Sequence, residues 1–323
     1  MYRDPVHDGA TDPTLIRHRA TGEWWMFYTA RRPDLECDGA EWVHGTDIGI
    51  ATSTDGGRSW TYRGTAEGLE FEPGRNTYWA PEVLWHDGTY HMFVSYLSGV
   101  RSDWSGDAQI LHYTSQDLAR WDLASVLDLG SERVIDAAVY GLPGGGWRLW
   151  FKDERDGSRI HAADSPDLYS WKRRPGPAAA GDQPQEGPSV FRLAGSYWMV
   201  TDNWSGLSVY RSQDLDTWSR EPYQLLAPHG HHAMAVEQGD DQALLVYFSH
   251  VGDEHDRHAA EERRSVVRAK PLTVRDGRLV CAPGTAADAA FAQLRAELTP
   301  PLRGGARPGA QMPEWARRES ANA

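Results

Sequence analysis

The chain of 323 residues lacks several features that would restrict its class at once. It has only two cysteines, Cys37 and Cys281, which excludes a disulfide framework and favours a reducing compartment. It has no run of about 18 apolar residues, the length that a membrane-spanning helix requires. The stretch MYRDPVHDGATDP contains no apolar signal-peptide region, so the sequence predicts a cytoplasmic protein without a membrane partner.

Positive charge and helical periodicity are also scarce. The formal net charge is −13, and an acidic chain has no electrostatic means of gripping a phosphate backbone, so nucleic acid is not expected as a partner. Helical periodicity is weak until residues 286–298, AADAAFAQLRAEL, which predict one short helix. We therefore expect one large domain over residues 1–283 and a short helix with a tail over residues 284–323.

Tryptophan and strand-like apolar segments are abundant, and the segments recur. The chain has 15 tryptophans and 40% hydrophobic residues, which is enough for a large core. A turn followed by an apolar or aromatic strand begins at residues 22, 88, 145, 195 and 241: GEWWMFYTA, GTYHMFVSY, GGWRLWFKD, GSYWMVTDN and DQALLVYFSH. Such spacing is typical of four-stranded propeller blades with loops of unequal length.

Two further segments accompany these copies. Each of the first four copies is followed by an alternating strand and a Ser-x-Asp turn that ends in tryptophan, and this tryptophan is predicted to pack on a neighbouring blade: Trp60, Trp121, Trp171 and Trp218. Each of the five copies is preceded by a predicted innermost strand: DPTLIRH, APEVLWHD, IDAAVYGLP, EGPSVFRLA and HHAMAVEQG. Five such units predict an all-β fold, a five-bladed β-propeller.

Three of the five predicted inner strands begin with an acidic residue, Asp12, Asp136 or Glu186. Each lies nine or ten residues before the turn glycine of its own blade, so we expect the three carboxyl groups at similar depth in one channel mouth. Asp4, in a second Asp-Pro pair, lies eighteen residues before that turn and fits less well. Converging carboxylates raise at least one pKa, and cleavage of a glycosidic bond needs one protonated acid beside one ionised base.

The order and spacing of TDPTLI, YWAPEV, VIDAAV, QEGPSVF and GHHAMAV resemble those of glycoside hydrolase family 43, whose members are five-bladed propeller glycosidases. The resemblance spans about residues 10–250. It implies an inverting hydrolase in which Asp12 is the general base and Glu186 the general acid. Asp136 would hold the acid in place and raise its pKa. Ala137 and Ala138 depart from the Pro-Ser pair that often follows this aspartate in the family.

The histidine-rich run HGHHAMAV is a candidate ion site. It has no cysteine or HExxH partner, so catalytic zinc is not expected and the chemistry is predicted to need no cofactor. In similar family members a histidine of this motif reaches the channel axis, where a calcium or sodium ion often lies. The resemblance assigns that place to His231, with His232 as the alternative. A hydrogen-bonded channel histidine without an ion is the second interpretation.

Four residues are candidates for substrate binding. Trp79, at the start of the second inner strand, is predicted to stack on a sugar face, and Trp204 is predicted to rim the pocket. His250, in YFSHVG, is predicted to contact the substrate. Glu82 completes the set, with packing as its alternative role.

The favoured function is an inverting glycosidase that removes terminal pentose or furanose residues, such as α-L-arabinofuranose or β-D-xylose, from an oligo- or polysaccharide. Long connections over residues 31–47 and 95–109 favour a walled pocket and exo action. Two alternatives remain open, namely a β-fructosidase-like or phosphorylase propeller enzyme and a non-hydrolytic carbohydrate-binding propeller. The released anomer and a requirement for phosphate separate them.

Overall fold

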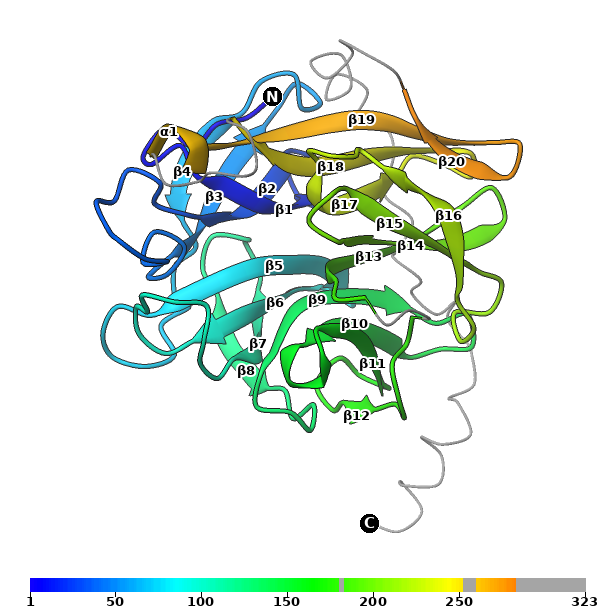
Figure 1. Ribbon diagram of the computed structural model, residues 1–323, viewed down its shortest axis with the longest axis horizontal. Coiled ribbons are helices and arrows are strands. Elements are labelled where there is room, and N and C mark those ends of the chain that lie inside the picture. Colours follow the sequence, from blue (N-terminus) through cyan, green and yellow to red (C-terminus); the bar gives the residue numbers. More distant parts are fainter. Residues whose placement is uncertain (180–182, 252–259, 283–323) are drawn as a thin grey trace.

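The structure is a computed structural model that describes residues 1–179, 183–251 and 260–282. These residues form five four-stranded antiparallel sheets around a common axis, which confirms the predicted five-bladed β-propeller (Figure 1). The helix predicted at residues 286–298 lies outside the described residues. None of the helices in the described part of the chain has the length and apolar character needed to span a membrane.

Each blade consists of four strands that are consecutive in sequence. The first blade contains β1 (Ala10–Arg17), β2 (Trp24–Ala30), β3 (Asp47–Ser53) and β4 (Thr61–Thr65). The second contains β5 (Thr77–His86), β6 (Thr89–Leu97), β7 (Gln109–Ser115) and β8 (Asp122–Val126). The third contains β9 (Val134–Gly141), β10 (Trp147–Asp153), β11 (Arg159–Ser165) and β12 (Lys172–Arg173).

The fourth blade contains β13 (Glu186–Leu193), β14 (Ser196–Asp202), β15 (Leu207–Ser212) and β16 (Ser219–Leu225). The fifth contains β17 (His231–Glu237), β18 (Gln242–His250), β19 (Ser265–Arg275) and β20 (Arg278–Cys281). Two short helical segments lie between strands, η1 (Glu154–Asp156) and α1 (Ala260–Arg263). The five predicted inner strands are β1, β5, β9, β13 and β17, which neighbour one another around the ring.

The core lies between the blades, because the strands nearest the axis are buried on both faces. This burial explains why segments such as WWMFYTA read as nearly continuous apolar runs. The outermost strands face solvent on one side, and β4 accordingly alternates exposed and half-buried residues.

The Ser-x-Asp turns fix the tryptophans that follow them. In the second blade, Ser115 Oγ accepts a hydrogen bond from the Leu118 N–H at 2.9 Å, and Trp121 Nε1 donates to the Leu118 carbonyl at 3.1 Å. The Trp121 ring then packs edge-on against Phe27 of the first blade at 5.7 Å. Equivalent contacts join Trp171 to Phe93 and Trp218 to Trp150, which confirms the predicted packing between blades.

The first and last blades share no strand, so other contacts close the ring. Tyr2 exchanges two backbone hydrogen bonds of 2.9 Å with Val267 in β19. Ser265 Oγ donates to the Ala10 carbonyl in β1 at 2.8 Å. Asp4, buried nearby, accepts hydrogen bonds from the backbone N–H groups of Val6 and His7. Asp4 therefore has a structural role at the seam between the blades.

Candidate active site

All five inner strands are irregular at the same point. One residue near the start of each strand has a positive φ, and the register with the second strand shifts there: Asp12 (51°), Ala80 (48°), Asp136 (62°), Gly187 (53°) and His232 (36°). Such bulges re-aim side chains. As a result, two successive residues of one strand line the same cavity, as Ile135 and Asp136 do in β9 and His231 and His232 do in β17.

The cavity has a volume of about 300 Å³ and lies at the starts of the inner strands. All three predicted carboxyl groups line it, from three different blades. Their depths differ from the expectation in one respect. Gly187 occupies the bulge position of β13, so Glu186 stands one residue earlier than Asp12 and Asp136 and corresponds to Ile135 and His231.

Asp12 lies near two cationic side chains, Arg31 and His232. Its Oδ2 accepts a hydrogen bond from Thr11 Oγ1 at 3.0 Å and lies 3.6 Å from Arg31. Its Oδ1 lies 3.5 Å from His232 Nδ1. Burial alone would raise the pKa of Asp12, but the charges of Arg31 and His232 hold it below its ordinary value. Asp12 is therefore ionised at neutral pH, as a base requires.

Asp136 has the opposite tendency. Burial raises the pKa of Asp136 to about 6, and the Glu186 charge adds to the rise against opposing charges of His232 and Lys152. Its Oδ2 accepts a hydrogen bond from the Gly187 N–H at 3.0 Å. That bond fixes Asp136 beside the peptide that follows Glu186, which is the positional relationship expected of a residue that holds the acid in place.

Glu186 is held by two donors. Lys152 Nζ lies 2.9 Å from its Oε2, and Trp204 Nε1 donates to its Oε1 at 3.0 Å. Burial would raise the pKa of Glu186, but Lys152 lowers it below its ordinary value. The raised pKa thus belongs to Asp136 and not to Glu186. The reason is the charge of Lys152, a residue that no sequence pattern assigned to the site.

Lys152 belongs to a chain of charges along the cavity wall. Its side chain is only 5% exposed, and its Nζ also pairs with Glu154 Oε1 at 2.8 Å, while Glu154 pairs in turn with Arg133. Burial would lower the pKa of Lys152, but Glu186 and Glu154 raise it, so the amine is charged. A buried cation between two carboxylates couples the third and fourth blades at the cavity.

The two histidines have different partners. His231 Nδ1 pairs with Asp202 Oδ2 at 3.0 Å, which fits the interpretation of a hydrogen-bonded channel histidine. Burial would lower the pKa of His232, but Asp12, Asp136 and the neighbouring carboxylates raise it, so the cavity favours the charged form of His232. In the described part of the chain, no three His, Cys, Asp or Glu side chains form a metal site. The calcium or sodium ion remains a prediction.

Three tryptophans line the cavity. Trp79 is 8% exposed, and its Nε1 donates to the Val43 carbonyl at 2.7 Å, which fixes the ring at the cavity wall. Trp104 lies 6.2 Å from Trp79 between ring centroids. Trp204 is 44% exposed and contacts Glu186 directly. Trp79 and Trp204 thus line the cavity, and their roles in substrate binding remain predictions.

The other two predicted contact residues lie differently. His250 lines the cavity and packs edge-on against His231 at 5.8 Å between ring centroids. Glu82 does not line the cavity. It is 6% exposed and accepts a hydrogen bond from the Val139 N–H of the third blade at 3.3 Å. Because Glu82 follows the bulge at Ala80, its side chain is directed between blades, and its location corrects the substrate-binding prediction.

Several lining residues that the sequence did not predict lie at the end of the second strand of a blade. The second strand is antiparallel, so its end lies beside the start of the inner strand. Thus Lys152 pairs in register with Ile135, Asp202 with Glu186, and Phe248 with His231. Arg31 follows β2 in the same way. The available signal was a polar residue at the end of a second strand, as in YTARR, WFKDE and VTDNW.

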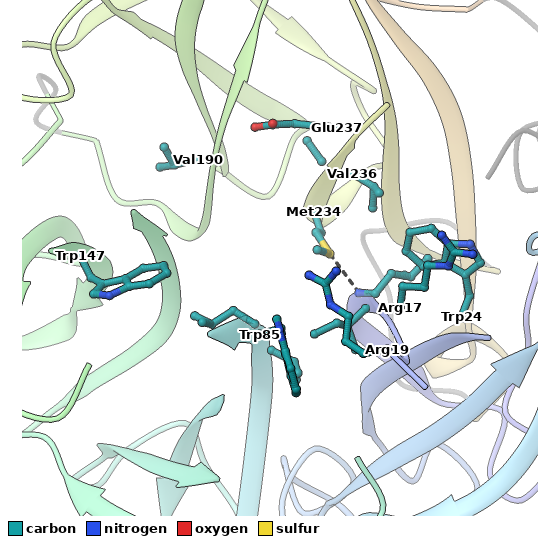
Figure 2. A pocket seen from close by; sticks show the side chains of 14 residues that line it. Arg17, Arg19, Trp24, Trp85, Trp147, Val190, Met234, Val236 and Glu237 are labelled. Atoms are coloured by element: carbon teal, nitrogen blue, oxygen red, sulfur yellow. Dashed lines mark hydrogen bonds between the residues drawn. The ribbon is translucent and has the colours of Figure 1, made fainter. Parts of the chain in front are cut away.

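The opposite end of the channel has a different character. A cavity of about 50 Å³ there is lined mostly by apolar residues of the inner strands. Figure 2 shows Trp85 and Trp147 around it, with the Arg19 guanidinium carbon 5.8 Å from the centroid of the Trp85 ring. Glu237 is the one acidic residue in this lining within the described residues. Paired acid–base chemistry is therefore supported at the first mouth and not at this one.

The fold and the carboxyl groups together define a five-bladed propeller with an acidic central cavity, and the same fold occurs in solved glycosidase structures. A thermostable family-43 glycoside hydrolase has a TM-score of 0.66 at 18% identity, over 88% of this chain and 97% of that one. The predicted resemblance to family 43 is thus confirmed at the level of the fold. No family model and no curated protein matches the sequence.

Two further structures share the propeller. One is the RS223 β-xylosidase, with a TM-score of 0.65 at 12% identity over 85% of this chain and 95% of that one. The other is an exo-1,5-α-L-arabinanase from a bovine ruminal metagenomic library, with a TM-score of 0.62 at 19% identity over 88% and 100% of the two chains. At these identities the likeness establishes the fold alone.

The bulge in β13 generates a testable prediction. A Cβ at Gly187 would lie 2.8 Å from the His232 ring, whereas a Cβ at Gly195 would meet nothing within 4 Å. Both glycines have positive φ, so an alanine costs about 1 kcal/mol at either position from backbone strain. Gly187→Ala adds overpacking of about 1–3 kcal/mol. We expect urea unfolding to show the larger loss for Gly187→Ala, and equal losses would contradict this account.

Proposed function

We propose that this protein is an inverting glycoside hydrolase that removes terminal pentose or furanose residues, in the manner of an α-L-arabinofuranosidase or β-xylosidase. One observation carries the proposal. Three carboxyl groups from separate blades line one cavity, the buried Asp12 and Asp136 and the half-buried Glu186, and the pKa of Asp136 is raised while the pKa values of Asp12 and Glu186 are lowered. Carboxyl groups with opposed protonation are what glycosidic cleavage requires. The glycosidase names of the structural neighbours support the same class.

In the proposed reaction, Asp12 accepts a proton from a water molecule as the water oxygen bonds to the anomeric carbon. Glu186 donates a proton to the glycosidic oxygen as the bond between that oxygen and the anomeric carbon breaks. Attack from the face opposite the leaving group inverts the anomeric centre. This geometry needs room for water, and the carboxyl groups of inverting enzymes are about 6.5–9.5 Å apart.

The acid role requires a proton on Glu186, although Lys152 favours its ionised form. Asp136 resolves this conflict, because it holds a proton below about pH 6 and is fixed beside Glu186 through the Gly187 N–H. The proton then belongs to the Asp136–Glu186 pair, and the form with the proton on Glu186 is the reactive one. Substrate that displaces Lys152 or Trp204 from Glu186 increases the population of this form.

The walls of the cavity favour exo action. The connections that follow β2 and β6 bond to each other, with the Ala40 N–H donating to the Ser102 carbonyl at 2.8 Å and His44 Nε2 lying 2.9 Å from the Asp103 carbonyl. The two connections together form one wall of the cavity, which includes Trp104. A cavity of about 300 Å³ is within the size range of small-ligand sites. It is large enough for one terminal sugar residue, whereas an endo-acting enzyme needs an open cleft.

The function is tested by a screen with aryl glycosides of arabinofuranose, xylose, galactofuranose and fructose, in which NMR records the first anomer released. We expect turnover of an arabinofuranoside or xyloside with inversion. A retained anomer would instead indicate a fructosidase-like enzyme, and a requirement for phosphate would indicate a phosphorylase. Sugar binding without turnover would indicate a non-hydrolytic propeller. Each of these three outcomes would overturn the proposal.

Removal of the acid should depend on the leaving group. We expect Glu186→Ala to lower kcat/KM for oligosaccharides by about 10²–10⁴-fold, because general acid catalysis contributes that much. Dinitrophenyl glycosides, whose leaving groups need little protonation, should retain most of their turnover. Asp12→Ala is the comparison, since loss of the base should inactivate the enzyme on both substrates. Equal loss of both activities in Glu186→Ala would refute the acid assignment.

Lys152, the cation beside Glu186, should set the pH above which kcat/KM falls. Activity needs the proton shared by Asp136 and Glu186, so kcat/KM should fall as pH rises through about 6. Lys152→Met removes the charge that lowers the pKa of Glu186, and we expect the alkaline limb to move upward by about 1 unit or more. Lys172→Met, at an exposed lysine of β12, is the control. An unmoved limb in Lys152→Met would disprove the coupling.

A further inference from the structure

A second cavity, of about 380 Å³, lies beside the first and is lined by the fourth blade and by residues 183–185 just before it. Trp204 lines both cavities and therefore forms the partition between them. The rest of the second lining is unlike the first, because it is made of amide, hydroxyl and aromatic side chains. Its polar side chains include Gln185, Asn203, Ser208, Tyr210 and Gln224.

Gln185 is the most constrained of these residues. It is 3% exposed, and both hydrogen bonds of its side chain within the described residues end on Oε1, from Thr201 Oγ1 at 2.7 Å and Tyr210 OH at 2.8 Å. This arrangement leaves the two N–H donors of Nε2 for the cavity. A buried amide that is fixed through its oxygen and offers its nitrogen is a built donor site, because unmade buried hydrogen bonds are costly.

The chemistry of this lining selects a ligand class. Asn203 Nδ2 donates to Ser208 Oγ at 2.7 Å, so these two side chains are also pre-positioned. Gln224 is an exposed amide on β16. Within the described residues the lining contains no carboxylate, and Arg220 is its one charged side chain. Neutral donors and acceptors beside an exposed indole ring match the hydroxyl groups and apolar face of a sugar.

The position of Trp204 shows on which side of the first cavity the second one lies. Its Nε1 donates to Glu186 Oε1, so the second cavity continues the first on the side of the proposed acid. The acid protonates the leaving-group oxygen, and the leaving group must therefore lie on that side. We propose that the second cavity is a subsite for the leaving-group sugar of an oligosaccharide, with Gln185 Nε2 as its buried donor. This inference rests on the proposed function for its direction.

The test compares substrates that do and do not place a sugar in the second cavity. Nitrophenyl arabinofuranoside and nitrophenyl xyloside place one sugar in the first cavity, whereas arabinotriose and xylotriose extend beyond it. Gln185→Met keeps the side-chain length but removes both the Nε2 donor and the Oε1 acceptor of Thr201 and Tyr210. Gln224→Ala removes an exposed amide of the same lining that has no such partners in the described part of the chain. Gln242→Ala, an exposed glutamine at the start of β18, is the matched control.

For the trisaccharide that the wild type hydrolyses, we expect kcat/KM to fall about five- to tenfold in Gln185→Met and about threefold in Gln224→Ala, in line with the loss of one neutral hydrogen bond. Turnover of the matching nitrophenyl glycoside should change less than twofold. Losses that are equal on both substrates, or absent in both variants, would overturn the subsite. Thermal unfolding identifies a variant that fails to fold, and Gln224→Ala then decides the matter.

A binding measurement separates this inference from the proposed function. Calorimetric titration of the wild type and both glutamine variants with arabinotriose and xylotriose is done after Glu186→Gln has been introduced to prevent turnover. Weaker trisaccharide binding in the glutamine variants supports the subsite even if the wild type hydrolyses no glycoside. Normal hydrolysis by the wild type with unchanged trisaccharide binding in both variants would reject the subsite and leave the proposed function intact.

Discussion

The left-handed bulge at the start of every inner strand is the constraint on which the cavity depends. A regular strand directs successive side chains to opposite faces, and would leave only one of each pair in the channel. The bulge brings Ile135 with Asp136, and His231 with His232, to one cavity. Four of the five bulge residues are not glycine, and each such backbone costs about 1–2 kcal/mol. Burial of the strands between blades is what keeps the ring in this strained form.

The charges of the cavity are balanced across blade boundaries. Inner strands supply the acids, while the ends of second strands supply cations such as Arg31 and Lys152. At Asp136 the nearby charges of His232 and Lys152 do not offset burial, and its pKa is raised. The distinct protonation of three similar groups is therefore decided by which blade brings a cation close to each.

Sequence patterns predicted the five repeats, the inner strands and the three carboxyl groups, because those features repeat along the chain. They did not predict that Glu186 lies one residue before the bulge position that Asp12 and Asp136 occupy. The bulge residue of β13 is Gly187, which has no side chain to show the position of the bulge in the hydrophobic pattern. They also placed Glu82 in the site, although its position two residues after Ala80 directs it between blades. Pairings such as Lys152 with Glu186 depend on contacts between blades, which no local pattern encodes.

The seam between the first and last blades has a consequence for the cavity. Residues near the amino end hold β1 against β19, and β1 also carries Asp12, two residues beyond the carbonyl that Ser265 binds. Met234 on β17 accepts a hydrogen bond from the Leu15 N–H across the same seam. Asp12, the proposed general base, thus lies where the first and fifth blades meet. Separation of the first and fifth blades would displace Asp12 and abolish activity even if the other blades remained folded. Loss of activity would then report the opening of the ring.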